Sequence, residues 1–76
     1  MHLYLVTNSK GSGDWVKIVL EGDVVYEGHN VSLWNVFDII RTCNGVEFMN
    51  YLELTDEQMK DAEAMYEVEP TRSYVL

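Results

Sequence analysis

The chain has 76 residues, and its 13 acidic side chains against five Lys and Arg give a net charge of −8 at pH 7. A hydrophobic fraction of 47% is too high for a disordered acidic tail, so residues 1–76 are expected to form one small folded domain. The single cysteine, Cys43, excludes an internal disulfide framework.

The first residues, Met1 to Tyr4, lack the positive segment and long apolar run of a secretory signal. No apolar stretch approaches the ~20 residues that span a bilayer, and the negative charge disfavours anionic lipid surfaces. We therefore expect a cytoplasmic protein without a membrane partner.

The first half of the chain begins with strand patterns. Residues 3–7 predict a strand, and residues 15–20 and 24–27 predict a β-hairpin whose turn centres on Glu21-Gly22 or on Gly22-Asp23. Strand alternation assigns the hairpin side chains to two faces. The core face would carry Val16, Ile18, Leu20 and Val25, and the outer face Trp15, Lys17, Val19, Val24 and Tyr26.

A helix is predicted next, from Leu33 to Cys43, capped by Asn30 or Ser32 and ended by Asn44-Gly45. Helical spacing predicts one buried stripe made of Leu33, Val36, Phe37, Ile39, Ile40 and Cys43. Trp34 falls on the polar side of this helix. Two interpretations stay open for it, because it either packs against the hairpin or is displayed to a partner.

The second half begins with a strand over residues 46–54, with an inward row that Asn50 interrupts, as at a bulge. Its outward row holds Glu47, Met49, Tyr51 and Glu53. The segment from Thr55 to Gln58 matches a capping box and predicts a helix from Asp56 to about Glu67. Its apolar face would hold Met59, Ala62 and Tyr66, and its opposite arc Asp56, Glu57, Asp61, Glu63 and Glu67 around Lys60.

Pro70 ends that helix, and residues 70–76 predict a flexible tail or a short terminal strand. The predicted class is α+β, a small antiparallel sheet of three or four strands with two helices in the order β-β-β-α-β-α.

The hairpin residues Trp15, Gly22 and Tyr26-Glu27-Gly28-His29 follow the spacing W-x6-G-x3-Y-E-G-H, and a capped helix comes after them. Over residues 14 to about 40, this pattern resembles small accessory proteins encoded by phages and prophages. The resemblance implies a viral protein of the kind that disarms a host nuclease or repair enzyme. It implies no catalytic residue.

The charge is concentrated in one segment. Eight of the 13 carboxylates lie between Glu47 and Glu69, where Lys60 is the only base. Such a field repels nucleic acid and attracts proteins with basic clefts. DNA presents about one negative charge per 1.7 Å of its axis, and carboxylates four residues apart on a helix lie about 5–6 Å apart at Cβ.

We therefore predict an inhibitor that presents carboxylates in place of phosphates to a nuclease, CRISPR effector, restriction enzyme or DNA glycosylase. The predicted contacts are Asp56, Glu57, Asp61, Glu63 and Glu67, with Glu47 and Glu53 extending the surface and Trp34 and Tyr51 as anchors. The alternative interpretation is a structural or self-assembly module whose acidic face only provides solubility.

Catalysis, cofactors and metals find little support in the sequence. Cys43 and His29 are the only candidate nucleophile and base, and Cys43 lies on a stripe where a buried, inert thiol is common. His2 and His29 have no partners at metal-ligand spacing. We expect no enzyme activity, no cofactor and no direct nucleic-acid binding.

Overall fold

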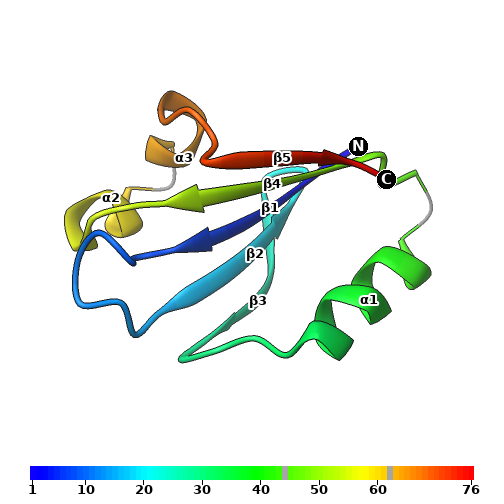
Figure 1. Ribbon diagram of the computed structural model, residues 1–76, viewed down its shortest axis with the longest axis horizontal. Helices are drawn as coiled ribbons and strands as arrows, with labels where there is room; N and C mark the ends of the chain where they lie inside the picture. The colour runs from blue at the N-terminus through cyan, green and yellow to red at the C-terminus, as the bar shows by residue number, and fades with distance from the viewer. Residues whose placement is uncertain (44, 62) are drawn as a thin grey trace.

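The computed structural model describes residues 1–43, 45–61 and 63–76, so the predicted helix stop at Asn44 and the apolar position Ala62 lie outside the described residues. The described chain forms a sheet with three short helices and is α+β, as predicted (Figure 1). The elements in chain order are β1 (His2–Thr7), β2 (Val16–Leu20), β3 (Asp23–Gly28), α1 (Leu33–Thr42), β4 (Phe48–Glu53), α2 (Asp56–Lys60), α3 (Ala64–Glu67) and β5 (Arg72–Val75).

The sheet has five strands in the order β3-β2-β1-β4-β5. Strand β1 lies at its centre, antiparallel to β2 and parallel to β4, with His2 opposite Phe48 and Thr7 opposite Glu53. The prediction of a purely antiparallel sheet is therefore wrong. Helix α1 follows β3 in the chain and leads back to the start of β4. Because of this crossover, β4 can run in the same direction as β1.

The C-terminal residues form β5, which decides between the two predicted alternatives in favour of a strand. It pairs antiparallel with β4, with Val75 opposite Phe48 and Arg72 opposite Tyr51. The amide of Leu76 also donates to the carbonyl of Glu47 at 2.8 Å. Strand β5 is thus an edge of the sheet, and its four residues are exposed.

The hairpin turn centres on Glu21-Gly22, because Leu20 pairs directly with Asp23. Both turn residues have positive φ, 51° and 82°, as a type I′ turn requires. The ladder then shifts register between Ile18 and Val19, so that Tyr26 lies opposite Ile18. This bulge moves Tyr26 from the predicted outer face into the core beside Ile18 and leaves Val25, predicted to face the core, 45% exposed. Val24 stays on the predicted face, opposite Val19.

Apolar side chains are buried on both faces of the sheet. On one face, Leu3 and Ile18 pack with Val36 of α1. On the other face, Val6 and Val19 pack with Leu52 of β4 and with Leu54 and Met65, which follow that strand. The prediction that Val19 lies on a solvated outer face is wrong, because α2 and α3 cover that face of the hairpin.

Asn50 lies in a regular part of the ladder, opposite Tyr4 and Ser73, and not at the predicted bulge. It is 5% exposed, and its amide oxygen accepts a hydrogen bond from the Ser73 hydroxyl at 2.9 Å. Its amide nitrogen lies 3.0 Å from Nδ1 of His2. These contacts satisfy a polar side chain within the apolar sheet and connect β1, β4 and β5.

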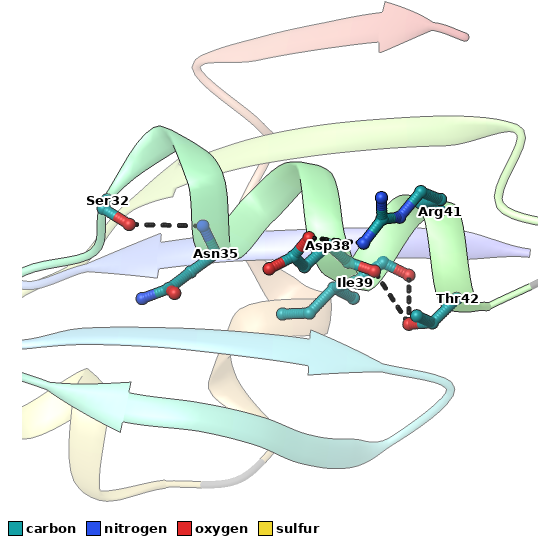
Figure 2. A network of polar contacts seen from close by, with 6 residues as sticks. All are labelled: Ser32, Asn35, Asp38, Ile39, Arg41 and Thr42. Atoms are coloured by element: carbon teal, nitrogen blue, oxygen red, sulfur yellow. Dashed lines mark hydrogen bonds and ion pairs between the residues drawn. The ribbon is translucent and has the colours of Figure 1, made fainter.

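Helix α1 begins at the predicted cap and is closed by local contacts, which Figure 2 shows. The Ser32 hydroxyl accepts from the amide of Asn35 at 3.2 Å. Near the other end, Arg41 donates to the Asp38 carboxylate at 3.1 Å and the Thr42 hydroxyl donates to the Asp38 carbonyl at 2.8 Å. The predicted bounds of this helix are correct to within one residue.

Candidate functional site

The acidic segment after β4 forms two short helices, so the single helix predicted from Asp56 to Glu67 is wrong. Its start is correct: the Thr55 hydroxyl accepts from the Gln58 amide at 3.2 Å, and the Gln58 side chain accepts from the Thr55 amide at 2.9 Å. Helix α2 then ends at Asp61, whose backbone is extended with φ −97° and ψ 114°.

Packing explains this break. Met59 and Met65 both pack against the core formed by Val6, Leu52 and Leu54. On an unbroken helix, two residues six positions apart lie about 120° apart around the axis, so both could not face the sheet. Ending α2 at Asp61 and starting α3 at Ala64 allows both methionines to contact it.

Four carboxylates nevertheless gather where the two helices meet. Glu57, Asp61 and Glu67 line one hollow of about 370 Å³, together with Gln58, Ala64 and Val68. Asp61 and Glu63 also line an adjoining pocket. We call Glu57, Asp61, Glu63 and Glu67 the acidic cluster.

The side chains of the acidic cluster are exposed to solvent. In residues 1–43, 45–61 and 63–76, the ion pairs are Lys17 with Glu27 and Arg41 with Asp38, and neither includes the cluster. Among the predicted contacts, these four are therefore brought together outside the ion pairs of the described residues, and one oxygen of Asp61 accepts from the Glu63 amide at 3.0 Å.

Asp56 has a different role from its neighbours. Its carboxylate accepts hydrogen bonds from the Asn8 amide at 2.7 Å, from the Ser12 amide at 3.1 Å and from the Ser12 hydroxyl at 3.0 Å. These donors, first the Ser12 amide and hydroxyl and then Asn8, hold the pKa of Asp56 below its ordinary value. The side chain fixes the loop between β1 and β2 to the start of α2.

Asp14 belongs to the same network. Its carboxylate accepts from the Ser12 hydroxyl at 2.8 Å and from the Asn8 amide at 3.3 Å, and these two contacts lower its pKa. Asn8, which is 4% exposed, also accepts from the Trp15 amide at 2.9 Å. Sequence reasoning missed this network because Asp56 lies 44 and 48 positions from its partners Ser12 and Asn8.

Glu53 and Tyr51 lie on the other face of the sheet. They line a groove of about 500 Å³ over β1, β4 and β5, together with Leu5, Met49, Thr71, Arg72 and Tyr74. Leu5 and Met49 also pack into the core beneath α1, which identifies the face. Glu47 is separate again, since its backbone amide donates to Met1 and its carbonyl accepts from Leu76.

Trp34 is displayed to solvent, which decides between the two interpretations left open by the sequence. Its side chain is 77% exposed and forms an edge-type ring contact with Phe37, with ring centroids 6.3 Å apart. Leu33 and Phe37, predicted to be buried, are 66% and 51% exposed, because α1 packs on the sheet through Val36, Ile39 and Ile40. Figure 1 shows α1, the helix that carries Trp34, at the opposite end of the molecule from α2.

The candidate nucleophile and base have separate surroundings. Cys43 caps α1, where its amide donates to the Ile39 carbonyl at 3.0 Å and its side chain packs with the α1 core. His29 lies edge-on to Trp15, and its Nδ1 is 3.1 Å from the Asp14 carbonyl. Within the described ranges, no three His, Cys, Asp or Glu side chains form a group that could hold a metal ion.

Comparison with known proteins gives no relative. No family model matches the chain, and neither the curated proteins nor the solved structures contain a match. In the parts of the chain that the structure describes, no helix is both long enough and apolar enough to cross a membrane.

Proposed function

We propose that this chain is a small acidic inhibitor that binds the nucleic-acid site of a basic host protein and presents carboxylates where that protein expects phosphates. The observation that carries the proposal is the acidic cluster, whose four exposed carboxylates surround one junction between α2 and α3. A basic DNA-binding cleft relies largely on Lys and Arg contacts to phosphate, and such groups would meet these carboxylates in the same way.

The proposed contact set is smaller than the one predicted from the sequence. Glu57, Asp61, Glu63 and Glu67 form the electrostatic contact, while Asp56 supports the scaffold beneath it. Glu47, Glu53, Tyr51 and Trp34 lie away from the cluster and do not contribute to the same contact surface.

A net charge of −8 supports this class of partner in a second way. Clustered negative charge accelerates association with a positive cleft and repels nucleic acid itself. The proposed targets are a restriction enzyme, a CRISPR effector or a uracil-DNA glycosylase, and the proposed origin is a phage that acts in the host cytoplasm.

The test measures competition with DNA. One purified member of each target class is mixed with labelled DNA, and the chain is titrated at roughly 50 mM and roughly 500 mM salt, where screening of exposed charges differs strongly. We expect the chain to displace DNA from at least one enzyme at the lower salt concentration and to lose this effect at the higher one.

A charge-reversal variant assigns the effect to the acidic cluster. Glu57→Lys, Asp61→Lys and Glu63→Lys together change the net charge from −8 to −2, because each replacement adds two charges. Asp23→Lys, Asp38→Lys and Glu47→Lys produce the same net charge outside the cluster. Loss of displacement in the first variant alone is expected; equal loss in both, or no displacement by the native chain, rejects the proposal.

A second candidate function is self-assembly, favoured by the exposed side chains of Leu33, Trp34 and Phe37 on α1. The strands at the two ends of the sheet order, β3 and β5, also offer free edges for pairing. Light scattering coupled to size-exclusion chromatography separates the candidates. An oligomer that persists at high salt and dissociates on Trp34→Ser supports assembly, whereas a monomer at both salt concentrations rejects it.

A further inference from the structure

A pocket with a mainly apolar lining adjoins the acidic cluster. It opens between the hairpin and the α2–α3 segment and has a volume of about 270 Å³. Its inner walls are apolar and include Val19, Leu54, Met59 and Met65, which belong to or pack against the core on this face of the sheet. The pocket is therefore a hollow in the core that reaches the surface.

The size of the pocket limits what it can hold. Clefts for drug-sized ligands and cofactors measure about 300–1,000 Å³, and this pocket lies just below that range. One large apolar side chain is a suitable occupant, because anchor residues of protein interfaces insert into pockets of this kind.

The charges around the pocket define what lies beside that side chain. Asp61 and Glu63 of the acidic cluster are on its lining. Lys17 is the one cation among the described residues of the lining. It is already engaged, since its Nζ donates to the Met59 carbonyl at 3.0 Å and lies 3.9 Å from the Glu27 carboxylate. The rim is thus negative and complements basic groups on a partner.

We infer that this pocket gives the acidic cluster its specificity for a partner protein. It receives one apolar side chain of the partner, the anchor, which is flanked there by Lys or Arg. The inference rests on the proposed function and adds to it a requirement that DNA mimicry alone does not make. Charge would govern the rate of association, and burial of the anchor would slow release.

Three short peptides test the inference without knowledge of the natural target. The first, Ac-Gly-Arg-Phe-Arg-Gly-amide, carries the apolar anchor and the flanking bases. The second replaces Phe by Ser, and the third replaces both Arg by Glu. Binding is followed by NMR, using the methyl signals of Met59 and Met65 and, for comparison, the side-chain signals of Leu33 and Trp34.

We expect the Phe peptide to bind about tenfold more tightly than the Ser peptide, because loss of a buried anchor costs more than about 1 kcal/mol. The shifts should centre on Met59 and Met65, and the Glu peptide should not bind. Equal affinity of the Phe and Ser peptides, no binding by any peptide, or shifts centred on Leu33 and Trp34 would overturn the inference.

A matched pair of variants locates the site. Val24 lines the pocket and is 52% exposed, so Val24→Phe adds bulk at its mouth. Val25 is 45% exposed and lies outside the lining, so Val25→Phe adds the same bulk elsewhere. Binding of the Phe peptide should weaken about tenfold in the first variant and remain in the second, with thermal unfolding confirming that both are folded.

The same pair separates this inference from the proposed function in the DNA-displacement assay. If Val24→Phe displaces DNA as well as Val25→Phe does, while charge reversal abolishes displacement, then the pocket inference is wrong and the proposed function stands. If the native chain displaces no DNA but the Phe peptide still binds at Met59 and Met65, then the proposed function is wrong and the pocket stands as a binding site.

Discussion

Asn8 and Asp56 are joined by a hydrogen bond of 2.7 Å although 48 residues separate them in the chain. Asn8 is buried at the end of β1, and Asp56 is in the first turn of α2. The bond therefore holds the beginning of the acidic segment against the centre of the sheet. It acts beside the packing of Met59 and Met65, which holds the two acidic helices to the sheet.

Replacing Asn8 by Ala should lower the free energy of unfolding by about 1–3 kcal/mol, because it leaves buried hydrogen-bonding groups without partners. The Trp15 amide loses its acceptor, and Asp56 and Ser12 each lose a contact. Urea denaturation measures the change. Ser9→Ala, at the exposed neighbouring position, is the control and should change stability little.

Acid should weaken the same network. Asp14 and Asp56 have pKa values below the ordinary value of 3.8, so the unfolded chain binds protons more readily than the folded chain. Their contribution is complete above the unfolded-state pKa and is lost as the pH falls through the folded-state pKa, which places the loss below about pH 4.

Urea denaturation at a series of pH values below neutrality measures this loss. The double variant Asp14→Asn and Asp56→Asn should show a smaller decrease in stability with acid than the native chain. Ser12→Ala, which removes a donor to both carboxylates, should reduce the decrease in part. An identical pH profile for all three proteins would show that the network does not stabilise the ionised carboxylates.

Truncation of Trp34 and truncation of Val36 should change the stability of the protein by very different amounts. Trp34→Ala should change the free energy of unfolding by less than about 0.5 kcal/mol, since the side chain is 77% exposed. Val36→Ala should cost about 1.5–2 kcal/mol, because it removes two buried methyl groups from the contact between α1 and the sheet. A large loss on Trp34→Ala would indicate that the tryptophan packs against the protein.

Salt should stabilise the native chain through the acidic cluster. Like charges around one hollow repel one another, and added salt screens this repulsion between exposed groups. The variant Glu57→Gln with Glu67→Gln should be more stable than the native chain at low salt by a few tenths of a kcal/mol. The difference should disappear at high salt, and a difference independent of salt would point to another cause.

Features set by neighbouring residues could be predicted from the sequence. The Thr55–Gln58 capping box, the Ser32 cap and the hairpin turn each depend on residues a few positions apart, and each is present. The concentration of carboxylates from Glu47 to Glu69 is likewise a property of the sequence alone, so the acidic character of this segment could be predicted.

Features set by distant contacts could not be predicted. The two faces of β3 depend on a bulge opposite Ile18 and Val19, which alternation within one strand does not reveal. The break at Asp61 follows from the need of Met59 and Met65 to face the same sheet. In the sequence Asp56 resembles a solvated helix residue, and its contacts with Asn8 and Ser12 distinguish it from the acidic cluster.

The central place of β1 has a consequence for the chain as it leaves the ribosome. Its partner β4 is synthesised 46 positions later, as the pairing of His2 with Phe48 shows. Until then, β1 and the hairpin can associate, but one side of β1 has no backbone partner, and long-range pairing of this kind slows folding. Nascent chains that stop short of β4 would expose that side and be susceptible to aggregation and chaperone binding.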